Sequence, residues 1–184
     1  MSLMNNKKGV IMGVANERSI AWGIAKELAN QGAELTFAYQ NESFKKRLIP
    51  LMESIQSTKC FECDASQNND QPNSIESLFK EISHYWDEID FVVHALAFSD
   101  KEELKGKYIN CSRENFRNSL DISAFSFTRT AKAAFPLMSN KGGSLLTLSY
   151  IGAERTTPNY NVMGVAKAAL EASGAGKGKI QAYM

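Results

Sequence analysis

The sequence predicts an α/β fold, a Rossmann-type doubly wound parallel sheet with helices on both faces. Three observations indicate this class. Five short apolar segments alternate with stretches of helical periodicity along the 184 residues. The apolar run at 90–95 is almost unbroken, which is typical of a strand buried on both faces. Gly13 follows the first apolar segment, where the chain must turn into a helix.

Each predicted element follows from a local pattern. Strands are predicted at residues 9–12, 34–39, 59–63, 90–95 and 144–149. Helices are predicted at 20–31, 43–55, 75–86, 112–138 and 158–172. Gly32 is a suitable end for the first helix, and Pro50 is expected to bend or interrupt the second. Ligands of such sheets bind at the carboxyl ends of the strands, so the site is expected there.

Composition restricts the class of protein. Hydrophobic residues make up 43% and charged residues 22%, and the formal net charge is +1. These values are ordinary for a globular domain and do not favour a nucleic-acid partner. No apolar run approaches the roughly 20 residues of a membrane span, and the start lacks an apolar signal region. We therefore expect no membrane association.

The cysteines and histidines do not predict a metal site. The three cysteines are an odd number, which favours a reducing compartment and a cytoplasmic protein. Cys60 and Cys63 form a C-x-x-C pair, but residues three apart on a strand point to opposite faces. A zinc site would also need further ligands, whereas no second cysteine pair exists and His84 and His94 are isolated.

Three strand ends carry candidate cofactor residues. Gly13 permits close backbone approach to a pyrophosphate, although G-x-G-x-x-G is absent and an ordinary strand–turn–helix remains an equal alternative. The Ser19 hydroxyl could cap the next helix, bind phosphate, or do both. The neutral Gln40 after the second strand favours NADH over NADPH. Asp64 could meet the adenine amino group or cap its own loop.

The strongest candidate for catalysis is the pair Tyr160 and Lys167. Seven residues are two helical turns, so both side chains are expected on one face of a helix. A lysine ammonium beside a phenol would lower the phenol's pKa from its usual value of about 10. Tyr160 could then bind a carbonyl oxygen and stabilise charge that develops there, while Lys167 donates to ribose hydroxyls.

The sequence around this pair resembles that of the NADH-dependent enoyl-[acyl-carrier-protein] reductases of the short-chain dehydrogenase/reductase superfamily. These use Tyr-x6-Lys where most members of the superfamily use Tyr-x3-Lys. The segments 150–155 and 158–172 match the family, as do Gly13-Val-Ala15 with Ser19-Ile20-Ala21, and the stretch 94–110. The resemblance covers about residues 7–173.

The resemblance implies a function and further site residues. It implies reduction of trans-2-enoyl thioesters on acyl carrier protein in bacterial fatty acid elongation, by a homotetramer. Hydride would go to the β-carbon, the residue matching Tyr160 would hold the enolate oxygen, and Tyr150 would lie beside the substrate. It also implies that the following residues line the cofactor: Gly13, Ser19, Ile20, Gln40, Asp64, Ala65, Ala97 and Lys167. Met163 would join Tyr150 and Tyr160 at the substrate.

The end of the chain departs from the family pattern. Residues 1–173 are expected to form one incomplete dinucleotide-binding reductase domain, and residues 174–184 an unmatched tail whose glycines disfavour helix. Without the family's C-terminal strands, we expect an exposed sheet edge and, if 184 residues are the whole molecule, weak or no turnover. Two alternatives stay open: a short-chain ketoreductase, which the Tyr-x6-Lys spacing disfavours, and a non-catalytic nucleotide-binding fragment.

Overall fold

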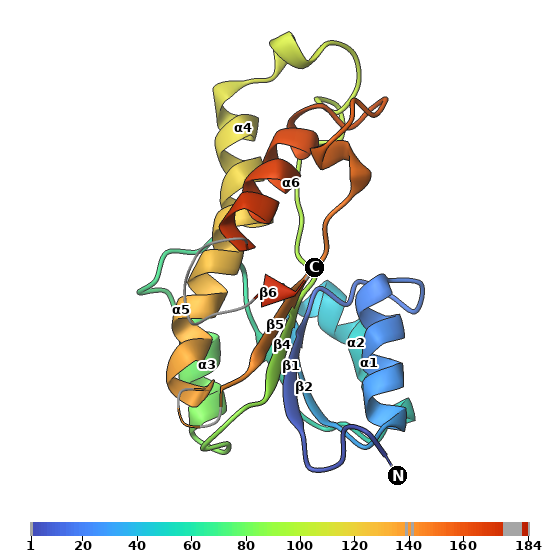
Figure 1. The fold of residues 1–184 in the computed structure, drawn as a ribbon, viewed down its shortest axis with the longest axis vertical. Coiled ribbons are helices and arrows are strands. Elements are labelled where there is room, and N and C mark those ends of the chain that lie inside the picture. The colour runs from blue at the N-terminus through green and yellow to red at the C-terminus, as the bar shows by residue number, and fades with distance from the viewer. Residues whose placement is uncertain (1, 139, 141, 175–181, 184) are drawn as a thin grey trace.

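A parallel sheet forms the centre of the computed structural model, which describes residues 2–138, 140, 142–174 and 182–183. The strand order is β3-β2-β1-β4-β5-β6, and every neighbouring pair is parallel (Figure 1). The strands are β1 (Lys8–Met12), β2 (Glu34–Tyr39), β3 (Cys60–Glu62), β4 (Phe91–His94), β5 (Ser144–Thr147) and β6 (Ala182–Tyr183). The order reverses direction at β1 and β4, which is the switch point of a doubly wound sheet.

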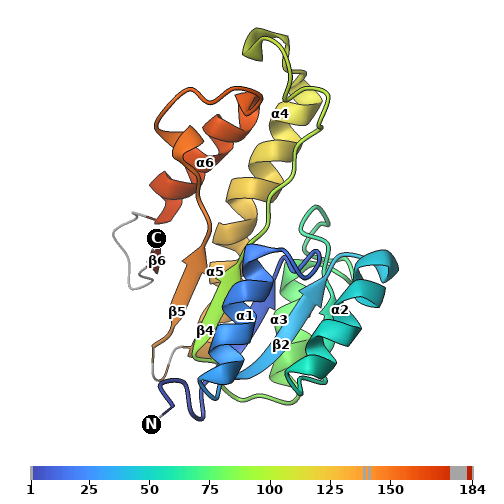
Figure 2. The ribbon, with the colours of Figure 1, turned by 90° about the vertical axis from the view of Figure 1, so that its right-hand side faces the viewer.

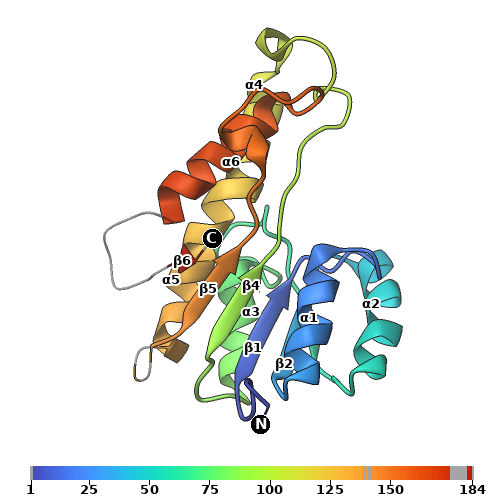
Figure 3. The same cartoon turned by 45° about the vertical axis from the view of Figure 1, so that its right-hand side comes forward.

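Helices cover both faces of this sheet. They are α1 (Ile20–Asn30), α2 (Glu42–Ser54), α3 (Ile75–Ser83), α4 (Arg113–Leu120), α5 (Ser126–Met138) and α6 (Asn161–Gly174). Shorter turns are η1 (Tyr108–Asn110), η2 (Asp121–Phe125) and η3 (Ile151–Ala153). Figures 1 and 2 show α1 and α2 on one face and α3 with α5 on the other. Both α4 and α6 lie beyond the carboxyl ends of the strands, as Figure 3 also shows.

The core has two layers because side chains of a strand alternate between faces. Val10 and Met12 of β1 pack with α3 and α5, whereas Ile11 between them packs with α1 and α2. Val92 and Val93 of β4 divide in the same way. The two central strands are therefore buried on both faces, which confirms the expectation from the nearly unbroken apolar run at 90–95.

The predicted elements are present, with three corrections. The helix predicted at 112–138 is divided by η2, a π-helical segment, although Ser112 caps its start by accepting from the Asn115 N–H at 3.1 Å. Pro50 lies inside α2 without ending it. The last helix begins at Asn161 and not at 158, so Tyr160 belongs to the preceding turn.

The tail beyond residue 173 contributes one strand that the sequence did not predict. In β6, Ala182 and Tyr183 pair with Leu145 and Leu146 of β5. The sheet therefore continues past β5, where the sequence led us to expect an exposed edge. The glycines at 176 and 178, which disfavour helix, fall outside the described residues.

Candidate functional site

A cavity of about 670 Å³ lies at the carboxyl ends of the four strands β1 to β4, and we name it the strand-end cavity. Each of these strands supplies part of its lining. The lining includes Gly13 after β1, Gln40 after β2, Asp64 and Ala65 after β3, and Ala97 after β4. These five residues were all predicted to face a cofactor, and the topology brings them together although they are far apart in the sequence.

The turn at Gly13 determines how closely the backbone approaches this cavity. Gly13 has a φ of +98°, which L side chains rarely adopt. A Cβ at this position would also collide with the carbonyl oxygen of Ala95, which lines the same cavity. The turn therefore needs glycine for both its backbone conformation and its contact with the loop after β4.

Asp64 fills one of the two roles that the sequence left open, the cap of its own loop. Its carboxylate accepts from the Ser66 N–H at 2.9 Å and from the Ser66 hydroxyl at 2.8 Å, so it caps its own loop. The same carboxylate accepts from the Gln40 amide at 3.4 Å, and both side chains line the strand-end cavity. The two predicted polar contacts of an adenosine group are thus joined to each other.

Ser19 and Ile20 stand at the start of α1 and do not line the strand-end cavity. The Ser19 side chain makes no cap hydrogen bond to the helix, so that predicted role is wrong. Its hydroxyl donates instead to the Asn16 carbonyl at 2.6 Å, which closes the loop before the helix. The first turn of α1 contains no acidic residue, so its positive dipole end is not neutralised by a side chain.

Tyr160 is held in a tight turn before α6. Its neighbours Asn159 and Asn161 both have positive φ, at 57° and 31°. Asn161 donates from its side-chain amide to the Glu103 carbonyl at 3.1 Å and so ties this turn to the loop after β4. The Tyr160 ring packs over Gly152, where any Cβ would collide with it. Tyr150 lies against it, with the ring centroids 4.9 Å apart and the planes tilted by 58°.

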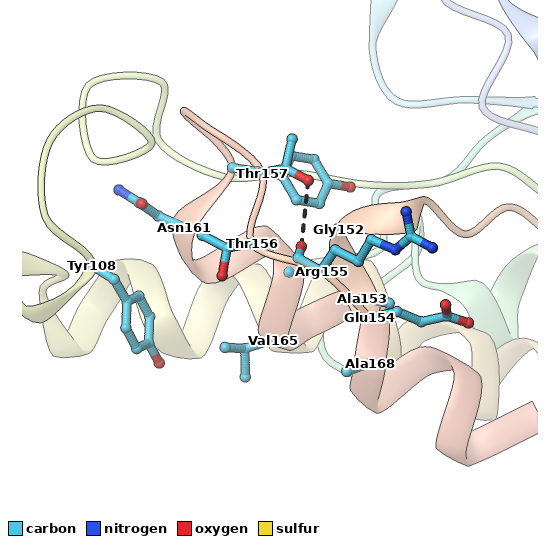
Figure 4. A pocket seen from close by; sticks show the side chains of 12 residues that line it. Tyr108, Gly152, Ala153, Glu154, Arg155, Thr156, Thr157, Asn161, Val165 and Ala168 are labelled. Carbon is cyan, nitrogen blue, oxygen red and sulfur yellow. Dashed lines mark hydrogen bonds between the residues drawn. The ribbon is translucent and has the colours of Figure 1, made fainter.

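A second cavity, of about 460 Å³, opens beside this turn, and we name it the Tyr160 cavity. Its lining comes from the 152–157 segment, from Tyr108, and from Tyr160, Asn161, Gly164, Val165 and Ala168. Figure 4 shows its labelled side chains, with the Thr157 hydroxyl donating to the Arg155 carbonyl at 3.4 Å. Tyr160 therefore faces a space separate from the strand-end cavity in this structure.

The electrostatics of Tyr160 and Lys167 differ from the expectation. Burial, with a smaller contribution from Tyr150, raises the pKa of Tyr160. Burial lowers the pKa of Lys167, and Glu171 partly opposes this. The Lys167 ammonium donates to the Leu148 carbonyl at 2.7 Å. The expected lowering of the phenol's pKa by Lys167 is therefore wrong for this structure: the phenol stays protonated and can act as a hydrogen-bond donor.

Met163 lies on α6 between these groups and the long α4–α5 helix. It is buried, and its sulfur is 3.7 Å from the Ser123 hydroxyl of η2. It lines neither of the two cavities described above. The structure thus places this predicted substrate residue inside the packing that joins α6 to η2.

His94 is fully buried, and no local sequence pattern marks it as a residue of the site. It ends β4 and bonds Thr147 of β5 at 3.2 Å and Ser126 of α5 at 2.7 Å. Burial, then the charge of Lys167, lowers the pKa of His94 to about 3. A neutral imidazole thus joins two strands and a helix next to Lys167. Its partners lie 53 and 32 residues away, which explains why a local pattern could not reveal them.

The residues of the strand-end cavity fit a dinucleotide. The glycine turn allows close backbone approach, a helix N-terminus with no acidic side chain follows it, and the Gln40–Asp64 pair offers polar contacts. Within the described part of the chain, no group of three or more His, Cys, Asp or Glu residues could hold a metal ion. Among the described helices, none combines the length and apolar character needed to cross a bilayer.

Comparison with known proteins identifies similar chains. A family profile described as enoyl-(acyl carrier protein) reductase matches residues 13–175. The chain is 54% identical over 171 residues to enoyl-[acyl-carrier-protein] reductase [NADH] 1 of Rhizobium meliloti. This match covers 93% of the chain and 61% of the relative. An enoyl-[acyl-carrier-protein] reductase [NADH] of Rickettsia bellii is 51% identical, with 63% of its length covered.

Solved structures are similar over the same extent. The enoyl-(acyl-carrier-protein) reductase of Anaplasma phagocytophilum, solved in complex with NAD, superimposes with a TM-score of 0.88 at 55% identity. The match covers 94% of this chain and 64% of that one. The NADH-dependent reductase of Aquifex aeolicus gives a TM-score of 0.88 at 42% identity. The chain therefore spans 61% to 64% of the length of the Rhizobium, Rickettsia and Anaplasma relatives and 67% of the Aquifex chain.

Proposed function

The chain belongs to the enoyl-(acyl carrier protein) reductase family, and we propose that it takes part in NADH-dependent reduction of trans-2-enoyl thioesters. The observation that carries the proposal is the Tyr150–Tyr160 ring pair before α6, together with the buried Lys167 seven residues after Tyr160. The reaction serves fatty acid elongation in bacteria, and the substrate is carried on acyl carrier protein.

We assign the cofactor to the strand-end cavity. Gln40 and Asp64 would meet the adenosine group, and Ala65 and Ala97 would contact it through their methyl groups. Gly13, Ser19 and Ile20 at the start of α1 would face the pyrophosphate through backbone N–H groups. The neutral Gln40 favours a ribose without a second phosphate, and so favours NADH. When bound, NADH supplies a hydride to the β-carbon of the substrate.

Tyr160 would act on the carbonyl oxygen of the thioester. Its raised pKa keeps the phenol protonated near neutral pH, so the hydroxyl can donate a hydrogen bond. Negative charge develops on this oxygen as the β-carbon is reduced, and a positioned donor stabilises that charge more than it stabilises the neutral substrate. A proton is then added at the α-carbon. Tyr150, whose ring lies tilted against that of Tyr160, would form a wall of the substrate site together with Met163.

Lys167 would hold the active-site segment and the cofactor ribose. Its ammonium already donates to the Leu148 carbonyl, where β5 passes into the segment that carries Tyr150. An ammonium has three donors, so two remain for ribose hydroxyls. One buried side chain would in this way fix both the cofactor and the tyrosine segment.

We further propose that the protein works in the cytoplasm as a homotetramer with acyl carrier protein as its partner. Support for self-association comes from exposed aromatic side chains on the long α4–α5 helix: Phe116, Phe125 and Phe135. Large exposed apolar side chains gathered on one element are typical of protein interfaces. None of the three side chains lines the strand-end cavity.

A turnover assay tests the substrate class. We would join residues 1–173 to the C-terminal segment of the Rhizobium meliloti reductase and follow NADH oxidation with a short trans-2-enoyl thioester. The expected result is oxidation with the enoyl thioester and none with the matching 3-ketoacyl thioester. Activity with the ketone alone would instead support a short-chain ketoreductase. NADH binding without turnover of either substrate would support a non-catalytic nucleotide-binding protein.

A further inference from the structure

Arg129 is a buried cation that the proposed reaction does not use. It lies on α5 and its side chain is only 8% exposed. Two of its nitrogens hold the Glu76 carboxylate of α3, with Nε to Oε1 at 3.1 Å and Nη2 to Oε2 at 2.7 Å. This is the bidentate geometry in which a guanidinium and a carboxylate match best.

The third contact of Arg129 reaches the strand-end cavity. Its Nη1 donates to the Ala65 carbonyl at 3.0 Å, in the loop after β3. Ala65 and its neighbour Asp64 both line that cavity. The two ends of this loop are joined to each other, because the Asp64 N–H donates to the Asn73 carbonyl at 2.8 Å. Arg129 thus connects α3 and α5 to the backbone that presents the Asp64 carboxylate.

The charges around Arg129 support a fixed arrangement. Burial alone would raise the pKa of Glu76, but the hydrogen bond from Arg129, a backbone hydrogen bond, and the charges of Arg129 and Lys132 together lower it. The Glu76 hydrogen bond raises the pKa of Arg129, with Asp121 of η2 adding to the effect. Lys132 also faces Glu76. The pair is therefore ionised, and the guanidinium has little freedom to leave the Ala65 carbonyl.

We propose that Arg129 is a positioning residue for the adenine end of the dinucleotide. By fixing the Ala65 carbonyl, it would set where the Asp64 carboxylate stands to accept from the adenine amino group. This inference rests on the proposed function, because it assumes a dinucleotide in the strand-end cavity. A purely structural ion pair between α3 and α5 would stabilise the fold equally but would not influence which base is bound.

Base selectivity distinguishes these two roles. The dissociation constants of NADH and of reduced nicotinamide hypoxanthine dinucleotide, which has oxygen in place of the adenine amino group, would be measured with the 184-residue chain. The variants are Arg129→Lys, which keeps a charge for Glu76 but cannot make all three contacts, and the double variant Arg129→Met with Glu76→Leu. Replacing both partners leaves no unpaired buried charge. Lys7→Met, which removes the Lys7–Asp90 ion pair at the other end of β1, is the control.

We expect the unmodified chain and Lys7→Met to prefer NADH, and both Arg129 variants to lose about tenfold in NADH affinity with little change for the hypoxanthine analogue. If the double variant does not fold, Arg129→Lys carries the test. Three results would overturn the inference. They are a preference for NADH over the analogue that the Arg129 variants retain, one that Lys7→Met loses, and the absence of any such preference in the unmodified chain. Failure of the unmodified chain to bind NADH would instead count against the proposed function itself, and the two failures are thereby distinguished.

Discussion

Gly13 directly follows β1, and its backbone lies against the loop after β4. Its φ of +98° is left-handed, and the Ala95 carbonyl occupies the space of a Cβ. Sequence alone predicts a glycine turn here, but it cannot predict the partner 82 positions away that makes glycine necessary. The strand-end cavity therefore depends on residue 13 having no Cβ.

Gly13→Ala is therefore expected to lower the free energy of unfolding by about 1–3 kcal/mol for the strained φ, with a further loss from the collision. Urea unfolding measures this change. Gly106→Ala is the matched control, because Gly106 also has a positive φ of 74° but nothing lies near its Cβ position. Equal losses for the two variants would mean that the contact with Ala95 contributes nothing measurable.

His94 ties three elements of the site together. The Ser126 hydroxyl donates its proton to the Ile122 carbonyl at 2.7 Å, so His94 Nε2 must donate to Ser126. His94 Nδ1 then accepts from the Thr147 hydroxyl. A neutral imidazole therefore joins β4 and β5 to α5. Its partner in β5, Thr147, directly precedes Leu148, whose carbonyl accepts the hydrogen bond from Lys167.

This network predicts a loss of stability in weak acid. The pKa of His94 falls from 6.5 to about 3 in the folded state, so only the unfolded chain takes up this proton between those values. Stability contributed by the neutral form is thus complete above pH 6.5 and lost as the pH falls. The slope should reach up to about 1.4 kcal/mol per pH unit.

Urea unfolding of the unmodified chain and of His94→Gln between about pH 7 and pH 5 checks this expectation. Glutamine can still donate and accept hydrogen bonds but does not titrate. The unmodified chain should lose stability more steeply than the variant. Identical slopes would show that His94 makes no contribution in this range.

The elements differ in how well their sequence patterns define them. Strand β2 has the predicted bounds, because Gly32 precedes this short, largely apolar run and the polar Gln40 and Asn41 follow it. The apolar spacing at 112–138 did not predict η2, because a π-helical segment changes the backbone hydrogen bonds without changing that spacing. Tyr160 lies outside α6 because Asn159 and Asn161 adopt left-handed conformations, which asparagine tolerates.

The sequence predicted which residue types line the site, but it did not predict the hydrogen bonds that hold them. Four strand ends bring five of the eight predicted cofactor residues together, because topology alone decides that arrangement. The partners of Lys167, His94 and Arg129 come from distant segments, 19 to 64 positions away, so no local spacing encodes them. An arginine on an amphipathic helix also has the pattern of a solvated residue, which is why Arg129 could not be recognised.

At the scale of the whole molecule, α4, η2 and α5 form a long helical arm with exposed aromatic side chains. Phe125 is 54% exposed and Phe135 is 46% exposed. Water around such rings is displaced when a second surface covers them, which favours association. The arm extends past the sheet in Figures 1 and 3, where a second copy could reach it.

We expect the unmodified chain to self-associate and Phe125→Asp to shift it to smaller species in sedimentation velocity. A buried charge without a partner opposes association strongly. Ile49→Asp is the control, because Ile49 is an exposed apolar residue of α2 on the other face. A monomeric unmodified chain, or an equal effect of the two substitutions, would contradict the proposed interface.

Hydrogen-bond donation by the Tyr160 hydroxyl to the substrate oxygen is tested by a single kinetic comparison. In residues 1–173 joined to the C-terminal segment of the Rhizobium meliloti reductase, kcat for enoyl thioester reduction would be compared between the unmodified protein and Tyr160→Phe. Loss of a positioned donor should lower kcat by about 100-fold or more, while the Kd for NADH stays within about twofold. A Tyr160→Phe variant that keeps the full rate would contradict the assignment of Tyr160 and the mechanism that depends on it.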